Sequence, residues 1–208
     1  MAYSKVGIAN MALQRLGAKS SITTWNEGTN GVKVASVWEY VLNEVLETVK
    51  PKFATVRVQL AKSSTAPSNT DVYECAYPLP SDYMTLAEGT AEDPSLWPPE
   101  LAPYAIETLA DGSLCIMTNY DTTEADDCVY VTYLRKITDP GKFNALFINA
   151  LAFRLAAELA FTVTEGQGKF ESMIQLYDRA RRHAQALDRK QEYIEYEKSN
   201  TTWEYAGR

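Results

Sequence analysis

The single histidine of the chain, His183, lies in the stretch "RARRHAQ" together with Arg179, Arg181 and Arg182. A catalytic histidine needs a nucleophile and an orienting carboxylate within hydrogen-bond reach, and a helical run of arginines supplies neither. Such a basic face can instead bind an acidic partner surface or phosphates, and its plainest interpretation is a solvated helix face. The residue types alone leave all three interpretations open.

Two further segments have residue types used in binding sites, but not the required spacing. The segment "TEGQGKFE" has two glycines near a helix start, yet it lacks the GxxxxGK[ST] spacing of a phosphate loop and follows a helix instead of a strand. We interpret Gly166 and Gly168 as a helix end and a tight turn between helices. The other segment lacks the glycine and closing glutamate of a calcium loop, although it contains Asp121, Glu124, Asp126 and Asp127. We therefore predict no catalytic residue, no metal site and no cofactor.

The composition is that of an ordinary globular protein, with 208 residues, 46% of them apolar and 23% charged. The net charge of -7 argues against a protein that coats nucleic acid indiscriminately, because that task needs a broad cationic face. Cys75, Cys115 and Cys128 form neither a CxxC motif nor a Cys/His cluster, so we expect no disulfide framework and no zinc site. No long apolar segment follows the early Lys5, and we expect a protein that is made and kept in the cytoplasm.

Residues 1–66 are predicted to be helical. Ser4 suits an N-cap and Gly17 a left-handed helix end, which places a short amphipathic helix over residues 5–16. A second apolar stripe predicts a longer helix from about residue 31 to residue 49.

This second helix is expected to end or kink at Pro51. The spacing of Phe53, Val56 and Leu60 predicts one or two further helical turns after it.

Residues 67–137 are predicted to form a small β lobe. In "YAIETLADGSLCIMT" the pair Asp111 and Gly112 can occupy the two positive-φ positions of a tight hairpin turn between two strands. The run "CVYVTYLRK" predicts a further strand with two alternating faces: Val129, Val131 and Tyr133 on one, and Tyr130, Thr132 and Leu134 on the other.

A long apolar helix is predicted next. Asp139 as N-cap with Pro140 at the first helical position marks its start. Residues 143–163 are long enough to span a membrane, but polar and charged interruptions make a helix buried among other helices the favoured interpretation. Arg154 and Glu158 lie one turn apart and are expected to pair.

The last predicted helix covers residues 168–198. Its apolar residues are spaced alternately by three and four positions, as in a helix that packs along one partner. At about 1.5 Å per residue it spans roughly 45 Å and should overhang the preceding helix. The seam consists of Phe170, Met173, Tyr177, Ala180, Ala184, Leu187, Gln191 and Ile194.

These elements predict an α+β fold, mainly α, in which long antiparallel helices carry an inserted antiparallel β lobe and an extended C-terminal tail. The helical part consists of residues 1–66 and 138–198, the inserted lobe of residues 67–137 and the tail of residues 199–208.

Five segments occur in a fixed order over residues 4 to about 187: "IANMALQRLG", "VLETVKPKFATVRVQLA", "YPLPSDYM", "FINALAFRLAAELA" and "YDRARRHA". In this order they resemble the tail-tubular-protein-A and head-to-tail adaptor family of tailed bacteriophages. In that family an "N.AL..LG...I" opening, an "L....PW.FA..R..LA" segment, a "Y.LP.DY" turn, an "F...L...LA..LA" helix and a "Y..A...A" helix recur. Lys52 stands where the family usually has tryptophan after the proline, which suggests a position that faces water or a neighbour.

The resemblance implies structural work without catalysis. Members of that family assemble as a ring, commonly of about twelve copies, beneath the portal of a DNA-filled capsid. The ring joins the portal to the tail or nozzle and continues the channel through which genomic DNA passes without sequence-specific binding. The implied partners are further copies of the chain, a portal protein and a tail or nozzle protein. The implied place is the head-tail junction of a virion assembled in the host cytoplasm, with no membrane involved.

The segment "SNTTWEYAGR", residues 199–208, is too polar to fold alone, because each ordered residue costs roughly 1 to 2 kcal/mol of backbone entropy. Either it stays disordered or a partner orders it. In an adaptor, Trp203 and Tyr205 would fill pockets on the portal or a neighbouring subunit, and Glu204 and Arg208 would pair at the rim. The candidate partner-binding residues are these four together with Arg179, Arg181 and Arg182.

Two other functions stay open. A nucleic-acid-binding protein would use the basic face of the last helix, and its affinity for duplex DNA would fall steeply with salt. The residues of that face are Arg179, Arg181, Arg182, Arg189 and Lys190. A hydrolase or transferase would need a nucleophile pair that the sequence does not show.

Overall fold

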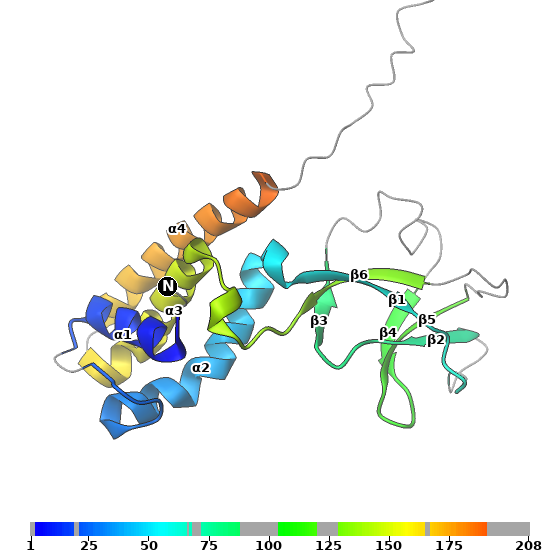
Figure 1. Cartoon of the computed structure of the whole chain (residues 1–208), viewed down its shortest axis with the longest axis horizontal. Helices are drawn as coiled ribbons and strands as arrows, with labels where there is room; N and C mark the ends of the chain where they lie inside the picture. The colour runs from blue at the N-terminus through cyan, green and yellow to red at the C-terminus, as the bar shows by residue number, and fades with distance from the viewer. Residues whose placement is uncertain are drawn as a thin grey trace, which may run out of the picture.

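In the residues that the structure describes, four helices lie at one end of an elongated molecule and two three-stranded antiparallel sheets at the other (Figure 1). This computed structural model describes residues 3–18, 21–65, 67, 72–87, 104–119, 129–164 and 167–190. The predicted α+β fold class, mainly α with a small β lobe, is confirmed. The helices are α1 (Lys5–Leu16), α2 (Gly28–Val49), α3 (Ala145–Thr164) and α4 (Gln167–Lys190), with the short 3-10 helices η1 (Lys52–Ala54) and η2 (Pro140–Lys142). The strands are β1 (Thr55–Leu60), β2 (Cys75–Pro78), β3 (Tyr83–Leu86), β4 (Tyr104–Thr108), β5 (Leu114–Thr118) and β6 (Val129–Arg135).

The first helix begins and ends where its capping residues predict. The Ser4 side chain accepts a hydrogen bond from the amide of Gly7 at 3.1 Å. At the other end, Gly17 has a φ of +74°, and the amides of Gly17 and Ala18 donate to the carbonyls of Gln14 and Leu13. Both ends of α1 thus satisfy backbone groups that a helix terminus leaves without partners.

The apolar helix α3 forms the centre of the helical end. It contacts α1, α2 and α4, and its core side chains are almost fully buried, as predicted for a helix among other helices. By length and composition, its segment Ala145–Val163 would be sufficient to cross a membrane, and 61% of the apolar window is buried inside the protein. The side chains of the other helices therefore surround most of this segment.

The predicted start of α3 is wrong. Asp139 caps only η2, through a hydrogen bond from the amide of Gly141 to its Oδ1 atom. The α-helix begins later, because Asn144 Oδ1 accepts from the amide of Phe147 at 2.8 Å and acts as the N-cap. Asparagine is a favoured N-cap residue, but the Asp139-Pro140 pair a few residues earlier gave the stronger start signal in the sequence.

The seam of α4 is correct in its first part and wrong at its end. Tyr177, Ala180 and Ala184 are buried against the helical core, whereas Leu187 is 37% exposed and the next residue, Asp188, is buried. Gly168 lies in the first turn of α4 and not in a turn between helices. Among the positions predicted around this helix, Gly166, Gln191 and Ile194 lie outside the described residues.

The helical turns predicted around Phe53, Val56 and Leu60 are wrong beyond η1. Residues Thr55–Leu60 form β1, which pairs antiparallel with β6 from Thr55 opposite Leu134 to Leu60 opposite Val129. Strand β3 pairs with the other edge of β6, which gives the order β1-β6-β3. The β lobe therefore includes a strand from the range predicted as N-terminal helices.

The second sheet has the order β2-β5-β4 and contains the predicted hairpin. Only Gly112 of the turn has a positive φ, at +88°, so the prediction of a positive φ at Asp111 is wrong. Instead, the amide of Gly112 donates to the carbonyl of Leu109, and Asp111 Oδ1 accepts from the amide of Ser113 at 2.8 Å. This is the geometry of a three-residue hairpin loop with a left-handed glycine.

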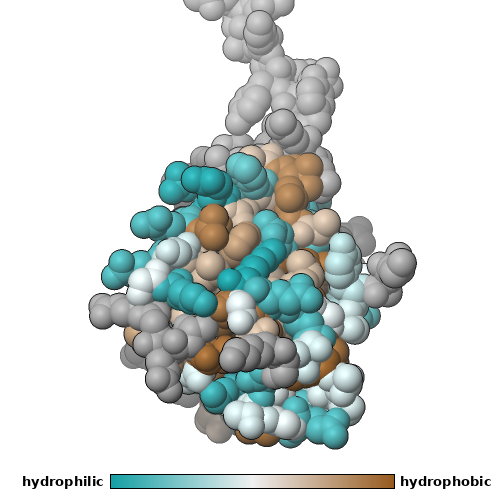
Figure 2. Space-filling view, turned by 90° about the vertical axis from the view of Figure 1, so that its left-hand side faces the viewer, coloured by the Kyte–Doolittle hydropathy of each residue, from teal (hydrophilic) through white to brown (hydrophobic). Residues whose placement is uncertain are grey.

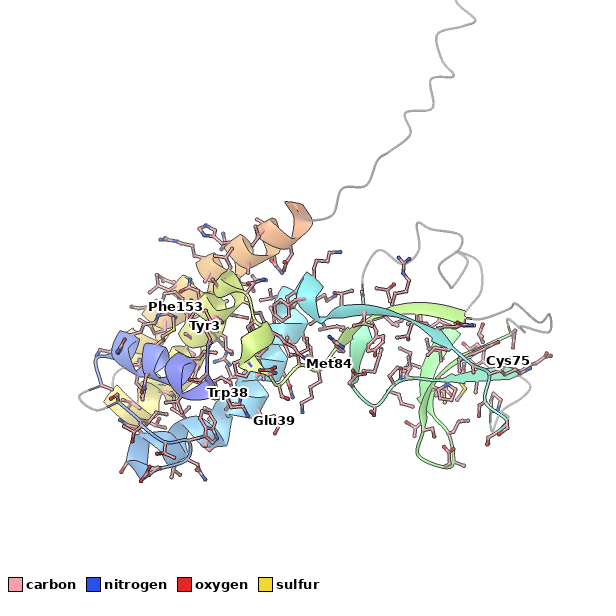
Figure 3. All side chains as sticks on the ribbon, viewed as in Figure 1. Tyr3, Trp38, Glu39, Cys75, Met84 and Phe153 are labelled. Atoms are coloured by element: carbon pink, nitrogen blue, oxygen red, sulfur yellow. The ribbon has the colours of Figure 1, made fainter. Side chains whose placement is uncertain are left out.

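Strand β6 joins the helical end to the β lobe because its two faces belong to different cores. Val129, Val131 and Tyr133 are buried between the sheets, as the predicted alternation requires. Leu134, on the other face, is buried in the helical core, and Met84 of β3 packs against the same core at the junction (Figure 3). Lys136, directly after β6, also binds Glu39 of α2.

Candidate functional site

The predicted basic face of the last helix is partly assembled on the surface of α4. Arg179, Arg182 and His183 are exposed at positions i, i+3 and i+4, so they lie on the side of α4 that faces away from α3. Arg181 does not belong to this face, because it is half-buried and lies 3.5 Å from Asp178. We name Arg179, Arg182 and His183 the cationic face of α4.

No carboxylate neutralises the cationic face of α4 within the described part of the chain. The sequence contains no Asp or Glu from Arg179 to Leu187, and among the described residues the side chains of Arg179, Arg182 and His183 form no ion pair or hydrogen bond. Arginines with free guanidinium groups bind carboxylates and phosphates through paired hydrogen bonds. The face is therefore chemically suited to an acidic partner surface or to a phosphate backbone.

The remaining predicted partner-binding residues lie outside the described residues. These are Trp203, Glu204, Tyr205 and Arg208. The side chains of Arg189 and Lys190, and the loop carboxylates Asp121, Glu124, Asp126 and Asp127, also lie outside them. Their predicted roles stay predictions. In the described ranges, no group of three or more His, Cys, Asp and Glu residues is arranged to hold a metal ion.

A buried arginine joins α3 to α2 through ion pairs. Arg154 on α3 donates to Glu158 at 2.8 Å, as predicted, and also to Glu44 of α2 at 2.8 Å. Burial lowers the pKa of Arg154, but its hydrogen bonds with the two carboxylates raise that pKa further than burial lowers it. The guanidinium therefore stays charged. Glu44 could not be predicted as its second partner, because no local sequence pattern links Glu44 to Arg154.

The end of α4 is fixed near η1 by a buried carboxylate. Asp188 is 5% exposed, and the backbone amide of Lys52 donates a hydrogen bond to it. Lys52 itself is half-buried, which qualifies the prediction that this position faces water or a neighbour. Burial raises the pKa of the Asp188 carboxyl, and the amide and charge of Lys52 only partly oppose this effect.

The raised pKa of Asp188 predicts a pH-dependent stability. Because the folded protein holds this proton to a higher pH than the unfolded chain, the stability contributed by Asp188 is complete below the ordinary carboxyl pKa of about 3.9 and is lost as the pH rises through the folded value. In Asp188→Asn this loss is absent, so its unfolding midpoint should rise relative to the wild type between about pH 3 and pH 7. Urea unfolding across this range, with the exposed Glu171→Gln as control, measures the difference. If the unfolding midpoints of the wild type and Asp188→Asn changed with pH in the same way, the raised pKa of Asp188 would be contradicted.

Asn10, in the opening segment "IANMALQRLG", binds the loop that follows α1. Its Nδ2 atom donates to the carbonyl of Ile22 at 2.9 Å, and its Oδ1 atom accepts from the amide of Ile22 at 2.8 Å. The Ile22 side chain is buried in the helical core. One asparagine therefore satisfies both backbone groups of a residue that the core holds in place.

Replacing Asn10 with alanine should lower the free energy of unfolding by about 1 to 3 kcal/mol, because both backbone groups of Ile22 lose their partners. Urea unfolding measures this loss, and amide exchange at Ile22 should become faster. Gln14→Ala, an exposed position on the same helix, should change the stability by about 0.5 kcal/mol or less. Equal effects of the two substitutions would rule out the role given to Asn10.

The turn "YPLPSDY" is joined to β6 by a side-chain hydrogen bond. The hydroxyl of Tyr133 donates to Asp82 Oδ1 at 2.8 Å, and the amide of Lys136 donates to the Asp82 carbonyl. Burial, together with the hydrogen bond to Asp82, raises the pKa of Tyr133 to about 12. Asp82 therefore fixes this turn to both the last strand and the loop after it.

The fold and these sites define an α+β protein with a free cationic helix face at its helical end. The chain matches no protein-family model and no curated protein sequence.

Proposed function

We propose that this chain is a structural head-to-tail connector of a tailed-phage virion. It would form a ring beneath the portal, join the capsid to the tail or nozzle and continue the DNA channel. The ring would contain about twelve copies, as in the adaptor family that the sequence resembles. The protein would act through binding and not through catalysis.

The observation that carries the proposal is that most of the residues responsible for the resemblance have structural roles. Asn10 and Gly17 fix the end of α1 and its loop, and Tyr77 and Asp82 belong to the core and turn of the β lobe. The apolar residues of the two helical motifs are buried in one core: Phe147, Leu151, Leu155, Ala156, Leu159, Ala160, Tyr177, Ala180 and Ala184. The motifs that resemble the adaptor family therefore form the core and the turns of this fold. This supports the proposal that the chain is an adaptor.

The shape and charge of the molecule agree with such a role. The helical end and the β lobe lie at opposite ends of an elongated body, so a copy in a ring would have two distinct regions to offer to two different partners (Figure 1). The net charge of -7 would help a channel to avoid gripping DNA phosphates.

A mixture of the purified protein with its portal protein tests the proposal. Native mass spectrometry and negative-stain images should show a ring of this chain on the portal. A protein that stays monomeric with the portal present would overturn the proposal.

Deleting residues 199–208 tests the role given to the tail within this proposal. The shortened protein should remain folded, because the described core lies outside that segment, and should bind the portal more weakly. Unchanged binding would remove Trp203, Glu204, Tyr205 and Arg208 from the candidate site.

The cationic face of α4 also favours a second function, the binding of nucleic acid. Arg179 and Arg182 are exposed without carboxylate partners among the described residues, as phosphate contacts require. This function predicts a gel shift of duplex DNA that weakens steeply with salt. Absence of a shift at low salt would exclude it.

A further inference from the structure

The exposed side of α2 differs in chemistry from the cationic face of α4, because it combines apolar and aromatic residues with one carboxylate. Its exposed residues follow helical spacing on the side away from α3, and they include Val32 at 54% and Tyr40 at 60% exposure. Glu47 is exposed on the same side, two turns after Tyr40. The sequence contains no Lys or Arg from Val34 to Val49. Of the three carboxylates in this range, Glu39 is paired with Lys136 and Glu44 with Arg154, so Glu47 is the one that forms no ion pair among the described residues. We name Val32, Ser36, Tyr40 and Glu47 the outer face of α2.

The two faces lie on opposite sides of the helical end. In Figure 1, α4 runs along the upper side of α3 and α2 along the lower side, although their C-terminal ends meet where Gln185 donates to the carbonyl of Thr48. Each helix buries one side against α3, so the exposed side of each helix points away from α3. Among the described residues, no ion pair or side-chain hydrogen bond joins the cationic face of α4 to the outer face of α2 within one copy.

The surface at the helical end favours a polar contact over a broad apolar one. Figure 2 shows hydrophobic residues there as separate patches among hydrophilic ones. Large continuous apolar patches mark many stable interfaces, but this end shows none among the residues that the figure colours. A contact on these sides would consist of charge pairs around an exposed aromatic residue such as Tyr40.

From this arrangement we infer that the cationic face of α4 in one copy binds the outer face of α2 in the next copy. Arg179 and Arg182 would lie against Tyr40 and Glu47 of the neighbour, combining cation-π and ion-pair contacts. Because the two faces differ and lie on opposite sides, the contact is head-to-tail, and repetition of such a contact produces a closed ring or an open filament. The inference rests on the proposed ring and gives it a specific interface.

Exposed charge pairs are individually weak and are screened by salt. The contact should therefore be weak between free copies and become strong when a portal collects many copies at high local concentration. The same property predicts that self-association decreases between about 0.05 M and about 0.5 M salt.

Charge reversal on either face tests the inference. Sedimentation velocity up to about 1 mM protein should show self-association of the wild type that weakens at least roughly tenfold in Arg179→Glu/Arg182→Glu and in Tyr40→Ala/Glu47→Lys. The matched control is Arg57→Glu, an exposed position on β1 in the β lobe, which should associate like the wild type. Circular dichroism verifies that each variant is folded. A wild type that stays monomeric over this range, or variants that associate like the wild type, would overturn the inference.

A mixture of the two variants distinguishes a head-to-tail contact from a symmetric one. The α4 variant keeps an intact outer face of α2, and the α2 variant keeps an intact cationic face. The mixture should therefore form heterodimers by native mass spectrometry although neither variant associates alone. Absence of heterodimers would contradict a head-to-tail contact.

The portal mixture separates this inference from the proposed function. A ring that forms on the portal equally well with Arg179→Glu/Arg182→Glu would keep the connector function and remove this interface. Absence of any ring with the wild type would remove the function itself. If the wild type shifts duplex DNA in a gel but stays monomeric, Arg179 and Arg182 would be assigned to nucleic-acid binding. This result would overturn the inference.

Discussion

Phe147→Ala should lower the free energy of unfolding by about 3 to 5 kcal/mol. The Phe147 side chain is completely buried, and its ring centroid lies 5.2 Å from that of Phe53 and 5.0 Å from that of Phe143. These three rings join α3 to the chain on both sides of the β lobe, since Phe53 lies in η1 and Phe143 directly follows η2. Removing the central ring would leave a cavity that neighbouring rigid elements cannot close. Urea unfolding followed by circular dichroism measures the loss.

Two substitutions calibrate this prediction. Phe147→Leu keeps most of the buried volume and should cost about 1.5 kcal/mol or less. Phe161→Ala lies on the same helix but at a position 52% exposed, and should cost about 1 kcal/mol or less. If Phe147→Ala and Phe161→Ala had equal effects, the junction would not depend on the cluster of rings.

Arg154→Met should lower the free energy of unfolding by about 3 kcal/mol, because removing one partner leaves other buried charges uncompensated. Glu44 and Glu158 would then face each other without the guanidinium that now lies 2.8 Å from both carboxylates. Their side chains are about one-third exposed, so solvent screening places the loss near the lower limit for a buried ion pair. Urea unfolding at neutral pH measures the effect.

The triple variant Arg154→Met/Glu44→Gln/Glu158→Gln should recover most of that loss, because it removes the remaining charges together. Arg182→Met, an exposed arginine on α4, should change the stability of the monomer by about 0.5 kcal/mol or less. A triple variant as unstable as Arg154→Met would show that methionine fits the site badly and that the charges are secondary.

The parts of the fold that the sequence predicted well depend on short-range signals. The limits of α1 follow from Ser4 and Gly17, which lie directly beside the helix that they cap. The burial of α3 follows from its composition alone, because a helix that is apolar nearly all round must be covered on all sides.

Strand β1 could not be predicted because its stability comes from a distant partner. Phe53, Val56 and Leu60 have a spacing that also suits a helix, and the pairing of β1 with β6 brings together segments separated by the rest of the lobe. Short apolar runs are ambiguous between helix and strand, and tertiary contacts decide between the two.

The seam of α4 shows how a small difference in period displaces a side chain. A strict alternation of three and four positions assumes 3.5 residues per turn, whereas a straight α-helix has 3.6 and drifts by about 20° per heptad. Over the length of α4 this drift exposes Leu187 and buries Asp188 instead. A pattern of 3.6 residues per turn would have located the buried carboxylate.

The candidate site was predicted in part. Helical spacing correctly places Arg179 and Arg182 on an exposed side, but it cannot show that Arg181 is half-buried beside Asp178. The contrast between the cationic face of α4 and the outer face of α2 requires knowing that both helices pack against α3 from opposite sides, which only the tertiary structure provides.

The junction has a mechanical consequence. Strands β1 and β6 both leave the helical end at the same point, where Thr55 lies opposite Leu134, and run along the long axis into the lobe (Figure 1). A pull between the two ends of the molecule therefore acts along the backbones of two hydrogen-bonded strands. Both covalent backbones carry this load in parallel, so the load crosses the junction without having to break the hydrogen bonds between β1 and β6. Tension along the length of the molecule is therefore carried by two backbone segments at the junction and not by one.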